Sequence, residues 1–210
     1  IKNYAKKVFG KFDLCIASNT ESENYLKVLG SKNIKNYGNL KFAKLKSDSN
    51  IKLNADFISK IGNRKIWCAA STHSSEELFC AKTHLIIKKK YQNILTIIIP
   101  RHINRIGKIA SELKKVNLKV LFYDDFMQID DSTDILLINT YGEALKFYKV
   151  AKCVFLGKSL IESLKKDGGQ NPIEPARLGC TIFHGPNVSN FNEVDEFLKS
   201  LNISNKVTTP

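Results

Sequence analysis

Short apolar runs alternate with amphipathic segments along most of the chain. The runs that predict strands are 13–17, 34–37, 66–70, 94–99, 118–122, 135–138, 153–156 and 181–183. The segments that predict helices are 21–29, 76–90, 103–116, 142–150 and 191–201. The β-branched run 94–99 is typical of a strand buried on both faces. This alternation predicts an α/β fold with a doubly wound, mostly parallel, Rossmann-like sheet.

One polar stretch, 44–54, interrupts the alternation and predicts a linker. The strand–helix–strand unit before it is too small to bury a core alone. We expect Thr20 or Ser22 to cap the helix of that unit. The sequence therefore predicts a small N-terminal piece over 1–43 and a larger domain over 55–210.

The formal net charge of +13 favours acidic partners, namely nucleic acid, anionic lipid or a phosphorylated substrate. Lysines are scattered, with few aromatic residues among them, so a specific nucleic-acid surface is not indicated. No apolar run approaches the roughly 18 residues of a membrane helix. The first residue is Ile1, from which we expect that the natural N-terminus lies further upstream.

Five cysteines, odd in number and without CxxC spacing, indicate reduced and mostly buried thiols of a cytosolic protein. The spacing of histidines, cysteines and carboxylates matches no zinc pattern, so we expect no metal. The helix over 76–90 begins with Glu76 and Glu77 and ends with three lysines, an arrangement that matches the helix macrodipole.

Polar motifs follow five of the predicted strands. They are 71–73, 100–102, 139–143, 157–159 and 168–176. Because the carboxyl ends of parallel strands share one edge of a sheet, the motifs predict a ligand site at that edge.

The motif over 168–176, with sequence GGQNPIEPA, combines flexible backbone with a helix start. Asn171 suits the N-cap and Pro172 the first helical position, where no amide hydrogen is needed. A helix beginning there would direct amides at a phosphate. Glu174 suits a ribose diol, or alternatively the capping box of an ordinary helix start.

The motifs at 142–143 and 157–159 predict a phosphate cradle with free amides, a lysine and a hydroxyl. The second is not a P-loop, because Lys152 stands where that motif requires another glycine. Arg101 can pair with a phosphate or carboxylate. His73 and His102 are candidate acids, bases or anion donors, or surface histidines without such a role.

The motifs together resemble those of 3-deoxy-D-manno-octulosonic acid (Kdo) transferases of lipopolysaccharide synthesis. In family order they are ASTH with EE (70–77), IPRH (99–102), TYGE (140–143), GKSL (157–160), QNPIEPA (170–176) and GP with NF (185–191). The segment GNLKF (38–42) is similar to the stretch before the family's interdomain crossing. The set covers nearly the whole chain and is specific only jointly.

This resemblance implies a GT-B-type glycosyltransferase that transfers Kdo from CMP-Kdo to a lipid A precursor, lipid IVA. The chain would be the C-terminal, donor-binding half with a remnant of the N-terminal acceptor half. The family's acidic base and membrane anchor lie in the N-terminal half. The resemblance therefore implies no catalytic residue here, an inactive fragment, and a whole enzyme at the anionic cytoplasmic face of the bacterial inner membrane.

The resemblance also implies a donor site without metal or other cofactor. Its residues would be Arg101, His102, Thr140, Tyr141, Gly142, Glu143, Gly157, Lys158, Ser159, Asn171 and Glu174. Three departures from the family pattern concern this site. Lys158 replaces the second glycine of the family's GGS motif, and Gln170 replaces a common histidine. The residues at 139–141 replace an aspartate-threonine-methionine run. Lys158 would narrow the phosphate loop or add a charge to it.

Two other functions fit the same residues. A non-catalytic nucleotide- or anion-binding module would use the same edge, with the basic charge recruiting it to a partner or membrane. A sugar-nucleotide epimerase of similar fold is the third interpretation.

Overall fold

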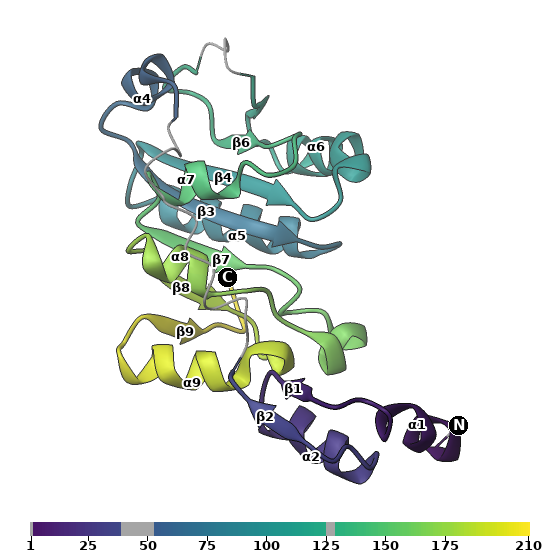
Figure 1. The fold of residues 1–210 in the computed structure, drawn as a ribbon. Helices are drawn as coiled ribbons and strands as arrows, with labels where there is room; N and C mark the ends of the chain where they lie inside the picture. The colour runs from purple at the N-terminus through teal and green to yellow at the C-terminus, as the bar shows by residue number, and fades with distance from the viewer. Residues whose placement is uncertain (1, 39–52, 125–128) are drawn as a thin grey trace. The chain divides into compact units, whose positions relative to one another are not determined.

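The computed structural model describes residues 2–38, 53–124 and 129–210 (Figure 1). The chain divides into two compact units, Ile1–Asn50 and Ile51–Pro210. The GNLKF segment after Gly38, and nearly all of the expected linker, lie outside the described residues. The assignment of the first unit to an acceptor domain stays a prediction.

The first unit is the strand–helix–strand piece that the sequence predicts, preceded by an unpredicted helix. Its elements are α1 (Lys2–Phe9), β1 (Cys15–Ala17), α2 (Thr20–Val28) and β2 (Ile34–Asn36), and β1 pairs with β2 in parallel. The predicted cap is wrong: Asn19 caps α2, and its side chain accepts a hydrogen bond from the Ser22 amide at 2.7 Å. Neither helix has a buried residue, as expected for a unit this small.

The second unit contains a seven-stranded sheet in the order β5-β6-β4-β3-β7-β8-β9 (Figure 1). The strands are β3 (Lys65–Thr72), β4 (Ile94–Pro100), β5 (Val120–Phe122), β6 (Ile135–Leu137), β7 (Cys153–Leu156), β8 (Thr181–His184) and β9 (Ser204–Lys206). Every pairing among them is parallel. The short edge strand β9 is not predicted by the sequence.

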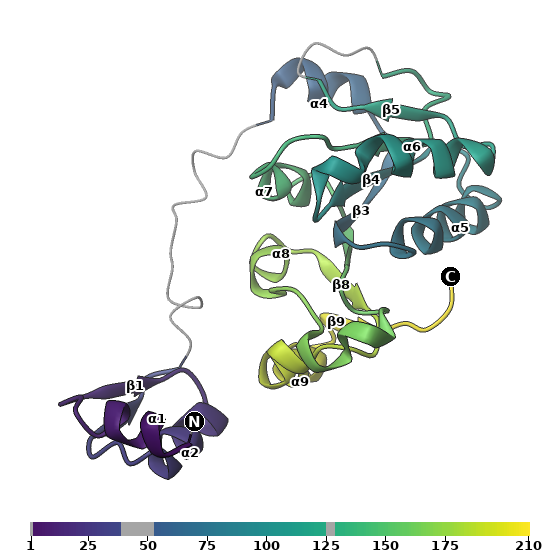
Figure 2. The same ribbon diagram turned by 90° about the vertical axis from the view of Figure 1, so that its right-hand side faces the viewer.

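Helices cover both faces of this sheet (Figure 2). One face carries α4 (Ala55–Ile61), α7 (Ala144–Tyr148), α8 (Ile173–Arg177) and α9 (Asn192–Ser200). The other carries α5 (Glu76–Lys88) and α6 (Ile106–Lys115). The 3₁₀ helices are η2 (Ile103–Arg105), η3 (Glu162–Asp167) and η4 (Ser189–Phe191). The predicted doubly wound, parallel α/β fold is confirmed.

Successive residues of the central strands enter two separate cores, as the pleat of a strand requires. In β3, Cys68 and Ala70 belong to the core under α4 and α7, and Ala69 belongs to the core under α5 and α6. All of β4 is buried, which confirms that the run 94–99 is covered on both faces. The predicted end of the strand at residue 70 is corrected, because β3 continues through Thr72 into the polar motif at 71–73.

A buried histidine joins the amino-terminal ends of the sheet to α5. His84 is fully buried, with its ring nitrogens 2.8 Å from Thr96 Oγ1 and 3.3 Å from Asp134 Oδ1. Burial lowers the pKa of His84, the Asp134 carboxylate opposes this, and the charges of Lys88 and Arg64 add to the lowering. The folded state therefore favours the neutral ring.

We expect the free energy of unfolding to fall as the pH is lowered through about 6.5, because the unfolded chain takes up the His84 proton first. Replacing His84→Gln should reduce the slope of stability against pH between about 7 and 5. Urea denaturation across this range measures the slope independently of any uniform destabilisation. An unchanged slope in the variant would contradict the assignment.

Candidate functional site

The predicted ligand edge contains a point where the chain leaves adjacent strands toward opposite faces. After β3 it continues into α5 on one face, and after β7 it continues through η3 into α8 on the other. Ligands of open parallel sheets bind in the crevice at such a switch point. The loops after β3 and β7 therefore define the candidate site.

One carboxylate holds both loops together. Glu76, at the start of α5, is fully buried. Its Oε2 accepts backbone hydrogen bonds from Lys158 (2.8 Å) and His73 (2.9 Å). Its Oε1 accepts from Ser159 and Leu160, each at 3.0 Å. Glu76 therefore lies in the first turn of α5, as the sequence predicts, and its buried carboxylate also binds the amides of both loops.

The loop over 157–160 therefore does not offer the free amides expected of a phosphate cradle. The Ser159 hydroxyl is also committed inside the protein, because it donates to the Leu156 carbonyl and accepts from the Gly185 amide at 2.8 Å. Ser159 itself is fully buried. The half-buried Lys158 side chain is what this loop can still present to a ligand.

Close packing and backbone conformation explain the rest of this loop. A Cβ on Gly157 would lie 2.4 Å from the Ser71 carbonyl oxygen and 2.8 Å from Glu76 Oε2, so only glycine fits. Lys158 has φ of 59°, in the left-handed region. It stands where the resemblance expects glycine, which adopts this conformation without the clash of a Cβ.

Two histidines meet beside Lys158. The rings of His73 and His102 contact edge to face, with centroids 5.5 Å apart. His73 Nδ1 lies 3.0 Å from the Ser71 carbonyl oxygen. Burial lowers the pKa of His73, and the charges of His102 and Lys158 act in the same direction. The Arg101 amide donates to the Thr72 carbonyl at 3.0 Å. This bond holds the backbone of Arg101 next to the end of β3, and the side chains of Arg101 and His102 are exposed there.

A second buried carboxylate, that of Glu77, forms an ion pair that fixes the segment after His102, and the sequence analysis does not predict it. Glu77 is fully buried and takes two hydrogen bonds of 3.1 Å from the Arg105 guanidinium. The Thr72 hydroxyl donates to the same carboxylate at 3.1 Å. The paired glutamates were the available signal, but their spacing alone gives no sign of burial.

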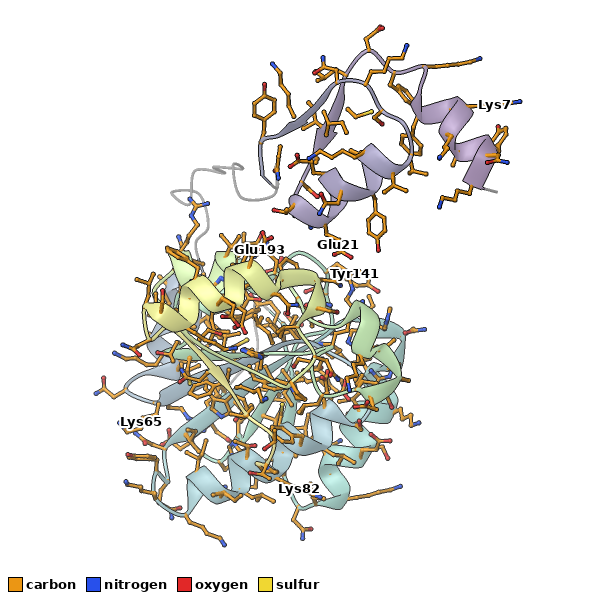
Figure 3. All side chains as sticks on the ribbon, turned by 90° about the horizontal axis from the view of Figure 1, so that it is seen from below. Lys7, Glu21, Lys65, Lys82, Tyr141 and Glu193 are labelled. Atoms are coloured by element: carbon orange, nitrogen blue, oxygen red, sulfur yellow. The ribbon has the colours of Figure 1, made fainter. Side chains whose placement is uncertain are left out.

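The segment over 139–143 is solvent-facing. Asn139 to Gly142 are exposed, with Tyr141 66% accessible, and Tyr141 projects from a different side of the second unit than Lys82 (Figure 3). Glu143 precedes α7 and forms an ion pair with Lys146 at 2.5 Å. The role of Thr140, Tyr141, Gly142 and Glu143 in donor binding stays a prediction.

The GGQNPIEPA motif forms the expected helix start with one difference. Asn171 Oδ1 accepts from the Ile173 amide at 3.1 Å, but α8 begins after Pro172, not at it. The Gly169 amide donates to the Lys158 carbonyl at 2.9 Å, which joins this motif to the 157–160 loop. The Glu174 side chain is exposed, and its two expected roles, ribose binding and the helix cap, stay predictions.

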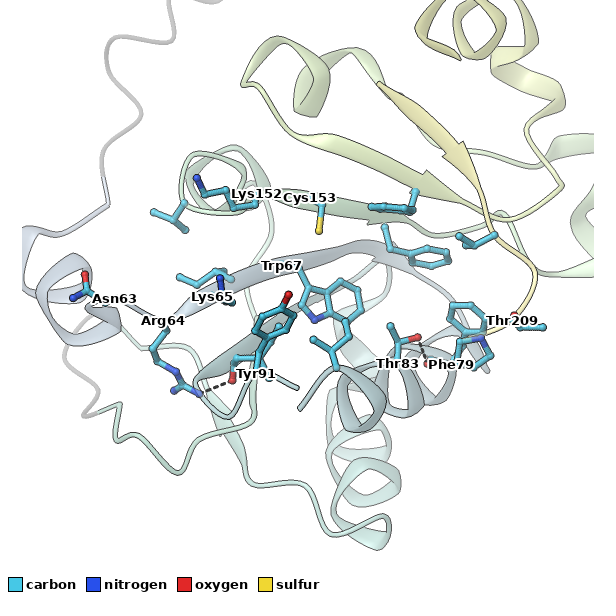
Figure 4. Close-up of a pocket in the computed structure, with 18 residues that line it drawn as sticks. Asn63, Arg64, Lys65, Trp67, Phe79, Thr83, Tyr91, Lys152, Cys153 and Thr209 are labelled. Carbon is cyan, nitrogen blue, oxygen red and sulfur yellow. Dashed lines mark hydrogen bonds between the residues drawn. The ribbon is translucent and has the colours of Figure 1, made fainter. Parts of the chain in front are cut away.

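An apolar cavity of about 720 Å³ lies elsewhere, over β3, β7 and β8 on the side of α5 (Figure 4). Trp67, Phe79, Phe155 and Phe183 line it, with Lys152 among the lining residues at the start of β7. Within the described residues, Trp67 Nε1 has no hydrogen-bond partner. The cavity is near the amino-terminal ends of the strands, whereas the polar loops follow their carboxyl ends, so the cavity is not part of the candidate site.

Residues 2–38, 53–124 and 129–210 contain no cluster of three or more histidine, cysteine or carboxylate side chains suited to a metal ion. In the same ranges, no helix has the length and apolar character needed to cross a membrane. All five cysteines are free thiols, four of them buried.

The sheet, its two-sided helix cover and its switch point are those of the C-terminal domain of a GT-B glycosyltransferase. A solved structure, the C-terminal CMP-Kdo binding domain of WaaA from Acinetobacter baumannii, is 25% identical with a TM-score of 0.64. The match covers 71% of this chain and 76% of that one. A trehalose-phosphate synthase from Burkholderia xenovorans, 10% identical with a TM-score of 0.55, supports the fold alone. No family model matches the chain.

Two of the curated relatives that the chain resembles are 3-deoxy-D-manno-octulosonic acid transferases. That of Haemophilus influenzae is 32% identical over 136 residues, 65% of this chain and 31% of the relative. That of Aquifex aeolicus is 29% identical over 189 residues, 90% of this chain and 48% of the relative. The resemblance to Kdo transferases is therefore confirmed, and the chain spans less than half of these relatives' length.

Replacing Lys158→Gly should stabilise the protein by about 1 kcal/mol, because glycine adopts the positive φ without strain. Lys158→Ala is the matched control, since it removes the same charge and keeps the Cβ. Denaturant unfolding should separate the two variants, with the alanine variant close to the native protein. Equal stability of the two would show that the backbone at this position carries no strain.

Proposed function

We propose that the second unit binds the donor of a Kdo transferase, a CMP-activated Kdo. The observation that carries this is the match to the Acinetobacter domain, whose name states CMP-Kdo binding, over 71% of this chain. The ordered motifs and the Haemophilus and Aquifex relatives support the same conclusion.

The chemistry of the edge fits a sugar nucleotide. Arg101, His102 and Lys158 bring cationic and imidazole groups to a crevice where a phosphate and a carboxylate must be neutralised. The side chain of Glu174 is exposed, so its carboxylate can accept from both ribose hydroxyls. We propose that these groups stabilise the leaving CMP and that no metal takes part.

The acceptor, by the same proposal, is a lipid A precursor held by the other half of the enzyme, which also supplies the acidic base. The first unit is the remnant of that half. The whole enzyme works at the cytoplasmic face of the inner membrane, where the net charge of +13 favours anionic lipid.

Calorimetry should show that this chain binds CMP in preference to UMP and AMP. Glu174→Gln should weaken CMP binding about ten-fold with little change in stability, because a charge-assisted pair of hydrogen bonds is replaced by weaker ones. Glu193→Gln, another exposed carboxylate, is the matched control and should bind normally.

The ligand 2′-deoxy-CMP tests the same contact from the other side. It should bind the native protein more weakly than CMP does, and should show little further loss with the Glu174→Gln variant. Equal losses in both proteins would place Glu174 away from the ribose.

The chain alone should not transfer Kdo, because the proposal places the base outside residues 1–210. A radiolabelled-donor assay with lipid IVA should give no product with the chain alone. Turnover by the purified chain would contradict the proposal that the base lies elsewhere.

A further inference from the structure

Three successive amides of the 157–160 loop converge on one point, as they do in loops that bind phosphate. A run of backbone N–H groups in a turn forms a concave anion site. Here the point of convergence is the Glu76 carboxylate, with bonds of 2.8 to 3.0 Å to residues 158, 159 and 160. The site is therefore already filled by an anion from the protein itself.

The same carboxylate fixes the loop after the neighbouring strand. Glu76 Oε2 accepts from both His73 and Lys158, which lie on the two loops that diverge at the switch point. One oxygen thus sets the spacing between these two backbones. The His73 ring packs against His102, so the spacing extends to the third loop of the edge.

We propose that Glu76 is a positioning residue whose carboxylate takes the place of a phosphate in the 157–160 loop and holds His73 and Lys158 at the spacing the donor requires. The proposal rests on the proposed function only for the identity of the donor. Its consequence is that side chains, and not the amides of this loop, meet the anionic groups of the donor.

Charge balance supports this division of roles. The amino terminus of α5 and the three loop amides all direct partial positive charge at the carboxylate. Once Glu76 has offset that charge, Lys158, Arg101 and His102 are the groups at the edge that can still attract an anion. This explains why a lysine stands at 158 where the resemblance expects glycine. The amides of the loop are occupied by Glu76, and the lysine side chain supplies the positive charge that attracts an anion.

The test compares Glu76→Gln and Glu76→Ala with Asp134→Asn. Asp134 is the control because it is also a buried carboxylate that accepts a backbone hydrogen bond, from the Lys119 amide at 2.9 Å. It lies at the amino-terminal ends of the strands, away from the polar loops. Amide hydrogen exchange of residues 158–160, CMP affinity and thermal stability are measured for each variant. Formate is then added as a small carboxylate to refill the vacated place.

Both Glu76 variants should speed exchange at residues 158–160 by ten-fold or more and weaken CMP binding by about ten-fold. Formate should slow the exchange and restore CMP affinity in Glu76→Ala. In the native protein it should change neither the exchange rate at 158–160 nor the CMP affinity. Asp134→Asn should lose stability, with exchange at 158–160 and CMP affinity kept. If Glu76→Ala folds only with formate, that is the same rescue, and Glu76→Gln supplies the exchange data.

Unaltered exchange at 158–160 in the Glu76 variants would overturn the proposal, as would lost stability with CMP affinity unchanged. If no form of the protein binds CMP, the proposed donor is wrong. The exchange and formate measurements still decide the role of Glu76 in that case, so the two failures are distinguishable.

Discussion

Four backbone amides from two loops donate to one buried carboxylate, that of Glu76. A buried amide without a partner destabilises a protein by about 1–3 kcal/mol, so this contact decides whether the edge can form at all. The glycine at 157, the left-handed Lys158 and the buried Ser159 hydroxyl follow from the loop being drawn onto α5. The loops of the ligand edge are thus held in place by Glu76 at the start of α5.

Other buried carboxylates in the second unit also have polar partners, which are side chains in these cases. Glu77 binds Arg105, Asp134 lies between His84 and Lys88, and the buried Asp195 receives the Ser204 hydroxyl and lies 2.8 Å from His184 Nε2. The pairs of Glu77 and Asp134 join segments 28 to 50 residues apart in sequence, and the contacts of Asp195 join β8, α9 and β9. Several residues of the family-like motifs therefore serve the architecture of the edge, which explains why a motif match is broader than a list of ligand contacts.

The sequence was sufficient where structure depends on local pattern. The limits of β7 were predicted correctly, and β4 was predicted as fully buried, because a β-branched run and its flanking polar residues are local signals. The cap of α2 was predicted at Thr20 or Ser22, one or three residues after the true cap Asn19, because all three residue types favour this position. The strand β9 was missed because its residues Ser-Asn-Lys carry no apolar alternation and depend on pairing with β8.

The role of Glu76 was missed for a different reason. Its partners in the 157–160 loop lie 82 to 84 residues away, and nothing in a helix start reveals that a distant loop will deliver amides to it. Conversely, the exposed Glu174 lies on the helix start that local chemistry predicts. The helix start at Asn171 depends on local sequence and was predicted, whereas the contacts of Glu76 depend on the tertiary fold and were not.

The apolar cavity over β3, β7 and β8 has an optical consequence. The chain has a single tryptophan, Trp67, and its indole forms part of the wall of the apolar cavity at 7% exposure. Indole emission shifts with the polarity of its surroundings, so the fluorescence of this protein reports on that one wall. Its emission therefore reports whether the apolar cavity is dry, hydrated or occupied, separately from events at the polar loops.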